Sequence, residues 1–466
     1  MLNKDAKPGR RAADQAPGAA APKLAQQLSL VAQCVRGVMQ GQSLNDLLVE
    51  VPGRLRPGVQ ALVFHVLRRQ GRARALVRRL APRRPAPAAE ALLVSAVALM
   101  ADALAGQEAP EGLRYEAHTL VNQAVEAAKR RPETGRHAAF INACLRRLLR
   151  EADALQAGLD EDPEARWNHP AWWVERLRQD HPGHWQAMLE ANNRPGPMTL
   201  RVNRRQTSRD AYREVLMAAG VPATPVGEDG LVLARAVPVG ELPGFEDGVC
   251  SVQDAAAQLA APLLLEGLPA VRADAGPLRV LDACAAPGGK TAHLLELADL
   301  DLLALDVDAQ RCERVRDNLR RLRLQAQVKV ADAGQVADWW DGRPFDAILL
   351  DAPCTASGIV RRHPDIRWLR RAQDVAQLAA TQARLLEALW PLLAPGGRLL
   401  YATCSVFRAE GQAQAEAFLA RHTDARSDRR LGHLLPGNAG LVADFADNVP
   451  GGYDGFFYAR LDKTAS

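Results

Sequence analysis

Chemically useful side chains stand at the ends of five apolar, strand-like segments in the C-terminal part of the sequence. The acids Asp282, Asp306, Asp332 and Asp351 close the first four segments, Cys354 follows the fourth in DAPC, and Cys404 closes the fifth in YATCS. In an open parallel sheet, ligands bind outside the carboxyl ends of the strands, so these side chains are expected to share one cleft. If this cleft also binds a methyl donor, two thiols and an acid beside that donor predict methylation of a carbon that is not itself nucleophilic.

Carbon 5 of a pyrimidine is such a centre. A cysteine thiolate that adds to carbon 6 makes carbon 5 enamine-like, and after methylation a base removes the carbon 5 proton so that the thiol can leave. A free cysteine has a pKa of about 8.5. Cys404 would therefore need a positive charge nearby, either Lys290 or the sulfonium of a cofactor.

The stretch LDACAAPGGKTAHLLE, residues 281–296, contains a GGKT that is typical of phosphate-binding loops. A Walker A motif requires glycine where this chain has Cys284, which disfavours a nucleotide hydrolase. The two glycines before Lys290 instead predict a tight turn, and a helix beginning there would direct free N–H groups at a ligand. Asp306, at the next strand end, suits ribose hydroxyls. Because the G-x-G-x-x-G pattern of NAD folds is absent, S-adenosylmethionine is the expected cofactor.

The elements that must position these groups follow from periodicity in a chain of 466 residues. Apolar residues recur at three- and four-residue steps from Leu24, which predicts amphipathic helices. An acidic, proline-punctuated linker is expected over 158–170, and a helix over 252–264 precedes alternating apolar strands and helices. The expected units are a disordered tail (1–22), an all-helical domain (23–150), a small α/β unit (166–250) and a Rossmann-like, doubly wound α/β domain with a parallel sheet (251–466).

Two arginine-rich stretches, residues 66–85 and 142–150, stand out in a chain with a formal net charge of +5. They fit a polyanionic partner such as nucleic acid, or solvated helix faces, and composition leaves both interpretations open. The basic run IVRRHP, residues 359–364, is expected to contact phosphate beside the cleft.

The seven cysteines include no C-x-x-C pair and no close Cys/His cluster. This pattern predicts a reducing, cytoplasmic environment and no metal site. No apolar run reaches the ~20 residues of a bilayer span, so no membrane partner is expected. The protein is expected to be a monomer.

Four segments resemble the motifs of the RNA cytosine-5 methyltransferases, in particular the bacterial 16S rRNA methyltransferases of the Sun/Fmu type. They are DACAAPGGKT, LDVD, DAPCTASGIVRRHPDIRW and YATCSVFRAEG, in the family's order. The resemblance covers nearly the whole chain, because these enzymes also carry a NusB-like helical N-terminal domain, which FINACLRRLLR resembles, and a small RRM-like unit. It implies methyl transfer from S-adenosylmethionine to carbon 5 of a cytosine in 16S rRNA, either naked or in an assembling small subunit.

The same resemblance implies individual roles. Cys404, in the Thr-Cys motif, would be the nucleophile, and Cys354, in the Pro-Cys motif, would assist proton removal and enzyme release. Asp351 would contact both the cofactor and the cytosine. The implied cofactor contacts are Cys284, Ala285, Ala286, Pro287, Gly288, Gly289, Lys290, Asp306, Asp332 and Asp351. One departure is AEGQ, where relatives commonly have Glu-Glu-Asn, although Glu410 is retained.

Three alternatives stay open at this point. The DNA cytosine-5 enzymes use the Pro-Cys thiol as nucleophile, which would exchange the roles of Cys354 and Cys404. The substrate could be tRNA or 23S rRNA instead of 16S rRNA. From a different class, the chain could be a NusB-like RNA-binding or ribosome assembly factor with an inactive methyltransferase fold.

Overall fold

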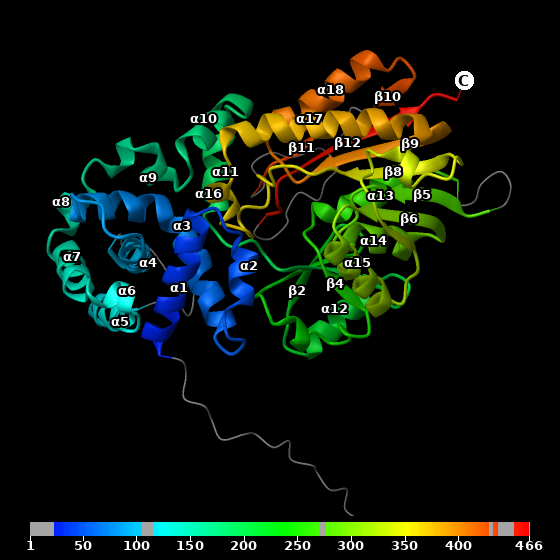
Figure 1. Cartoon of the computed structure of the whole chain (residues 1–466). Helices are drawn as coiled ribbons and strands as arrows, with labels where there is room; N and C mark the ends of the chain where they lie inside the picture. The colour runs from blue at the N-terminus through cyan, green and yellow to red at the C-terminus, as the bar shows by residue number, and fades with distance from the viewer. Residues whose placement is uncertain (1–22, 105–114, 270–275, 428–431, 437–451, 466) are drawn as a thin grey trace, which may run out of the picture.

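The computed structural model of the chain describes residues 23–104, 115–269, 276–427, 432–436 and 452–465. Its helices and strands form an all-helical N-terminal unit, a small α/β unit and a large C-terminal unit built on one sheet, with the helical unit beside the other two (Figure 1). The fold class predicted from the sequence is confirmed. The predicted disordered tail, residues 1–22, lies outside the described residues. No helix in the described ranges is long and apolar enough to cross a membrane.

The helical unit packs around a buried central helix. Its members are α1 (Leu24–Met39), α2 (Leu44–Val49), α3 (Arg56–Leu80), α4 (Pro87–Leu104), α5 (Ala117–Lys129), α6 (Pro132–Gly135) and α7 (Ala138–Arg150). The spacing on α1 places Leu28, Val31 and Val35 in the core, each fully buried. Helices α1, α3 and α5 all pack against α4, which explains why α4 is apolar nearly all round.

The segment expected to be a linker is folded instead. After α8 (Ala152–Gln156), it forms η1 (Leu159–Glu161) and α9 (Pro163–Trp167), and α9 packs against α3. The approach is close at Gly71, where a Cβ would lie 2.1 Å from the backbone oxygen of Glu164. Acidic residues of this segment pair with arginines of α3, such as Arg72 with Asp160 at 2.7 Å. The linker prediction was wrong because acidic and proline content does not reveal a packing partner.

Helices α10 (Ala171–Asp180) and α11 (Trp185–Asn192) lead into the small α/β unit. Its elements are β1 (Thr199–Val202), α12 (Arg209–Ala218), β2 (Ala223–Val226), β3 (Gly230–Leu233) and β4 (Cys250–Val252), with antiparallel strands in the order β2-β3-β1-β4. Arg201 of β1 forms a bidentate ion pair with Glu296, and both N···O distances are 2.8 Å. Because both side chains are buried, this pair fixes the small unit against the large one.

The large unit is one mixed sheet of order β10-β12-β9-β8-β5-β6-β7, with β11 paired to β12. Its strands are β5 (Leu278–Asp282), β6 (Leu300–Asp306), β7 (Gln327–Val330), β8 (Phe345–Asp351), β9 (Leu393–Thr403), β10 (Ala425–Ser427), β11 (His433–Leu434) and β12 (Phe456–Lys463). Strands β5 to β9 are parallel, as predicted. The expectation of a wholly parallel sheet was wrong at one side, because β12 returns antiparallel to β9 and carries β10 and β11.

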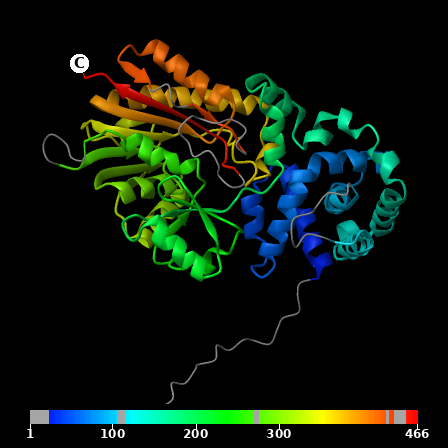
Figure 2. The same ribbon diagram turned by 180° about the vertical axis from the view of Figure 1, so that it is seen from behind.

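Helices cover both faces of this sheet (Figures 1 and 2). On one face, α13 (Ala260–Leu265), α14 (Gly289–Leu297) and α15 (Ala309–Leu322) share a core with Val280; on the other, α17 (Ala372–Leu389) and α18 (Gln412–Arg421) share one with Leu281. The alternation along β5 therefore serves two cores. The helix expected over 252–264 begins only at Ala257, as the short turn η3 (Ala257–Leu259), because Val252 still belongs to β4.

Candidate active site

The two cysteines singled out by the sequence meet at the carboxyl edge of the sheet. The Sγ atoms of Cys354 and Cys404 lie 3.5 Å apart, and both residues are partly exposed. Strands β8 and β9 are parallel neighbours that end at Asp351 and Thr403, just before these cysteines. Beyond the strands, the N–H of Gly358 donates to the backbone oxygen of Cys404 at 2.9 Å. Strand topology thus brings together two thiols that are distant in the sequence.

Glu410 fastens the two cysteine loops to each other. Its fully buried carboxylate accepts from the N–H of Thr355 at 2.8 Å and from the hydroxyl of Ser405 at 2.6 Å. These donors directly follow Cys354 and Cys404 in the sequence. Burial raises the pKa of the Glu410 carboxyl. Sequence reasoning noted only that Glu410 is retained, since no local pattern shows that one acid accepts hydrogen bonds from both loops.

A buried cation lies beside the thiols. The Nζ atom of Lys290 donates to Asp351 Oδ2 at 2.6 Å and lies 5.3 Å from the ring centre of Phe456. Burial disfavours the ammonium, but the Asp351 carboxylate outweighs it and raises the pKa of Lys290. Lys290 is therefore charged at neutral pH.

Two of the three cysteines at this edge are held as neutral thiols. The pKa of Cys354 is raised because its thiol hydrogen-bonds to Cys404 and is buried. Burial, together with the carboxylates of Asp351, Asp282 and Asp306, raises the pKa of Cys284. Since nucleophilic attack requires a thiolate, neither environment favours Cys354 or Cys284 as the attacking group.

The glycine turn and Asp306 form one connected loop structure. Asp306 is nearly buried and accepts from the N–H groups of Ala286 at 3.2 Å and Asp308 at 3.1 Å. Gly288 has φ of 96°, and a Cβ there would lie 3.1 Å from Val315 Cα, so this glycine permits both the turn and the approach of α15. Helix α14 starts immediately afterwards, at the position expected from the sequence.

The other two strand-end acids differ in exposure. Asp282 is fully buried and accepts from the hydroxyl of Thr291 at 2.6 Å, and burial raises the pKa of its carboxyl to about 7. Asp332 lies two residues beyond β7 and is partly exposed. Its carboxylate accepts from the N–H of Gly334 at 2.8 Å and lies 3.4 Å from a guanidinium nitrogen of Arg384. Asp282 is thus an internal support, whereas Asp332 retains access to solvent.

The basic run at 359–364 does not present its arginines to solvent. Arg361 is 2% exposed, with its Nε 3.7 Å from a carboxylate oxygen of Asp454. Arg362 donates to Asp454 at 2.6 Å and to Asp254 at 2.7 Å. Carboxylates remote in the sequence are thus partners of both guanidinium groups, and contact of this loop with phosphate stays a prediction.

The arginines of α3 also bind within the chain. Arg68 is buried and donates to the backbone oxygen of Arg361 at 2.6 Å, and Arg79 donates to that of Leu155 at 2.8 Å. Together with the ion pairs to η1 and α9, these bonds fasten the helical unit to its neighbours. Arg68 therefore does not belong to a solvated face, whereas contact of the other arginines of α3 with RNA stays a prediction.

The parallel sheet, its strand-end acids and the paired thiols define a multidomain, Rossmann-like methyltransferase. Residues 273–462 match the family described as 16S rRNA methyltransferase RsmB/F. Residues 169–240 match the ferredoxin-like domain of RsmF/B-like methyltransferases, and residues 25–150 match the NusB family.

Individual relatives agree with these matches. The chain is 42% identical over 457 residues to ribosomal RNA small subunit methyltransferase B of Pseudomonas syringae pv. tomato, covering 96% of this chain and 97% of that protein. It is 47% identical over 360 residues to the protein of the same name from Pseudomonas putida, covering 76% and 79% respectively. A crystal structure of a methyltransferase homolog protein from Pyrococcus horikoshii is 27% identical, with a TM-score of 0.53 over 65% of this chain and 98% of that one. The chain belongs to the RsmB/F family of 16S rRNA methyltransferases.

Proposed function

We propose that this enzyme transfers a methyl group from S-adenosylmethionine to carbon 5 of a cytosine in 16S rRNA, through a covalent bond to Cys404. The name shared by the relatives supports the RNA substrate. The observation that carries the covalent mechanism is the 3.5 Å pair of Cys354 and Cys404 at the carboxyl edge of the sheet. Two thiols so close to each other can take two different tasks, and the raised pKa of Cys354 argues against Cys354 as the attacking thiolate.

In the first step, the Cys404 thiolate adds to carbon 6 of the cytosine, which makes carbon 5 nucleophilic. The neutral Cys354 thiol can donate a hydrogen bond to that thiolate before attack, and the Lys290 cation adds a favourable field. S-adenosylmethionine supplies the electrophilic methyl group to carbon 5. Removal of the carbon 5 proton then restores the pyrimidine double bond and breaks the bond between carbon 6 and Cys404. A water molecule accepts this proton, and Cys354 assists the step because its neutral thiol can donate a hydrogen bond to the departing Cys404 thiolate. Asp351 hydrogen-bonds the cytosine.

The cofactor would lie against the turn and the strand-end acids. The proposed contacts are Cys284, Ala285, Ala286, Pro287, Gly288, Gly289, Lys290, Asp306, Asp332 and Asp351. Their chemistry fits the group: each Asp306 oxygen accepts one backbone N–H, and a carboxylate has about four lone-pair sites, so acceptor capacity is left for ribose hydroxyls. Asp332 has similar spare capacity.

The proposal also covers the domain boundaries, the oligomeric state and the location of the enzyme. Residues 23–150 would form the NusB-like RNA-binding domain, 166–250 the small RRM-like unit, and 251–466 the methyltransferase domain. The enzyme would act as a monomer in the cytoplasm. The seven cysteines are free thiols, which supports a reducing compartment.

The test is methyl transfer from labelled S-adenosylmethionine to 16S rRNA that lacks the modification, with 23S rRNA and tRNA as competing substrates. Label in 16S rRNA alone, located at one cytosine by bisulfite sequencing and lost in Cys404→Ala, is the expected result. Preferential labelling of tRNA or 23S rRNA would transfer the proposal to that substrate. Binding of 16S rRNA without labelling of any RNA would favour an assembly factor with an inactive methyltransferase fold.

A further inference from the structure

A polar cavity lies where the helical unit meets the large unit. It measures about 230 Å³ and is enclosed by residues of α1, α3 and α4, with Trp368 on α16 (Ile366–Leu369) contributing from the large unit. The indole N–H of Trp368 donates to the backbone oxygen of Leu67 at 2.9 Å, which fixes the ring in place. The cavity is therefore part of the contact between two units.

The lining of this cavity is rich in arginine. Arg36, Arg74 and Arg84 contribute three guanidinium groups, against the single carboxylate of Glu90. Within the described part of the chain, Arg36 pairs with Glu133 at 3.2 Å, Arg74 with Glu164 at 3.3 Å and Arg84 with Glu90 at 2.9 Å. A guanidinium carries five N–H donors, so each one keeps donors for a further acceptor such as phosphate.

Gln70 is the strongest indication of a ligand. It lines the cavity, is 1% exposed, and its Oε1 atom has no hydrogen-bond partner. A buried acceptor without a donor is unfavourable, and a ligand N–H or O–H would satisfy it. The cavity thus combines cations for a phosphate, an acceptor for an amino or hydroxyl group, and an aromatic ring.

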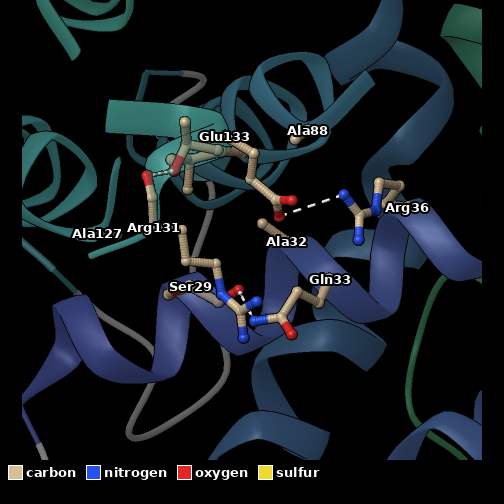
Figure 3. A pocket seen from close by; sticks show the side chains of 10 residues that line it. Ser29, Ala32, Gln33, Arg36, Ala88, Ala127, Arg131 and Glu133 are labelled. Carbon is tan, nitrogen blue, oxygen red and sulfur yellow. Dashed lines mark hydrogen bonds and ion pairs between the residues drawn. The ribbon is translucent and has the colours of Figure 1, made fainter. Parts of the chain in front are cut away.

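A neighbouring pocket that shares Arg36 does not have these properties. It is lined by residues of α1, α4, α5 and α6 (Figure 3), and its free space is about 10 Å³, enough for a water molecule only. Figure 3 shows Arg36 held from that side by Glu133.

We propose that the cavity formed by Arg36, Gln70, Arg74, Arg84, Glu90 and Trp368 binds one nucleotide of the substrate RNA, outside the active site. The inference rests on the proposed function, since it identifies a second contact with the same RNA. The arginines bind the phosphate, Gln70 accepts from the base or ribose, and Trp368 contacts the base. A nucleotide bound here would touch both units at once and so hold the RNA across their junction.

The test uses the full-length enzyme and unmodified 16S rRNA. Gln70→Met keeps the side-chain volume and removes the unpaired acceptor, so it should raise the melting temperature while weakening RNA affinity roughly fivefold, the loss of one hydrogen bond. Arg84→Gln should also weaken RNA binding. The matched control is Arg343→Gln, an exposed arginine paired with Asp341 before β8, at the opposite edge of the sheet, and it should leave affinity unchanged.

The kinetics of methyl transfer distinguish failure of the nucleotide site from failure of the proposed methyltransferase function. With the parent enzyme active, both pocket variants should raise KM for RNA and leave kcat unchanged, and unchanged KM in both would overturn the nucleotide site alone. An inactive parent enzyme would overturn the proposed function, and the pocket would then be judged by RNA affinity. Binding of cytidine monophosphate tests whether the cavity takes a free nucleotide instead of RNA. If cytidine monophosphate binds the parent enzyme but neither variant, while all three proteins bind RNA with equal affinity, the assignment to RNA is wrong.

Discussion

The carboxyl edge of the sheet and the arginine-rich helix α3 make an instructive contrast. At the sheet edge, single residues spread over more than a hundred positions converge on one place, with the two thiols 3.5 Å apart. In α3, a dense run of arginines that looks functional is largely used for internal bonds, such as Arg72 to Asp160 and Arg68 to Arg361. A position defined by strand topology therefore indicates function more reliably than a local excess of charge.

The largest expected effect concerns the buried acid of the sheet edge. The pKa of Asp282 is raised by burial from 3.8 to about 7, so its contribution to stability is full below about pH 4 and is lost as the pH rises to about 7. Asp282→Asn cannot ionise and should flatten the fall in unfolding free energy over that interval by of order a few kcal/mol. Urea unfolding at a series of pH values measures this. Equal pH dependence in both proteins would mean that Asp282 is not a buried, protonated acid.

The next effect concerns Glu410, whose carboxylate accepts hydrogen bonds from both cysteine loops. Because the N–H of Thr355 and the hydroxyl of Ser405 both donate to the Glu410 carboxylate, Glu410→Ala leaves these buried donors unpaired. It should cost about 1–3 kcal/mol of stability and lower kcat more than it raises KM. Glu387→Gln, which breaks an exposed pair with Arg421, is the control. If the two variants had equal kcat, Glu410 would not position the thiols.

A comparable effect is expected at the cofactor loop. Asp306→Ala should weaken S-adenosylmethionine binding by about 1–3 kcal/mol, because it removes the acceptor for ribose hydroxyls. Asp308→Ala removes the cap of α15 two residues away and should reduce stability without this loss of affinity. Calorimetry measures both. Unchanged affinity in Asp306→Ala would place the ribose elsewhere.

The smallest effect concerns the arginines of α3, which were contrasted above with the carboxyl edge of the sheet. Arg78 of α3 is more than half exposed but pairs with Asp162 at 3.2 Å. Arg78→Gln should leave the salt dependence of RNA binding unchanged and cost less than about 1 kcal/mol of stability. Arg84→Gln, by contrast, should reduce the slope of log affinity against log salt by roughly 0.7–0.9, as expected for one lost phosphate contact. A reduced slope in Arg78→Gln would mean that Arg78 also contacts RNA phosphate.

The sequence was sufficient to predict what depends on strand order. Hydrophobic alternation located β5 to β9, and the rule that ligands bind at carboxyl ends then placed Asp351, Cys354 and Cys404 at one edge. It failed where a long-range partner decides the outcome. Strand β12 runs antiparallel to β9, and Arg362 binds Asp254 and Asp454, although no local pattern distinguishes these residues from solvated ones. The hydrogen bonds to Glu410 are also invisible to local sequence patterns, since the donors come from two separate loops.

The division of labour between the two thiols is tested most directly by trapping. Unmodified 16S rRNA and S-adenosylmethionine are incubated with Cys354→Ala and with Cys404→Ala, and the products are resolved by denaturing gel electrophoresis. Both variants should fold, because replacing a partly exposed thiol by a methyl group removes little packing. Cys354→Ala should accumulate a protein–RNA adduct, since methylation proceeds but proton removal is impaired, whereas Cys404→Ala should form none. An adduct in Cys404→Ala alone would make Cys354 the nucleophile and contradict the account.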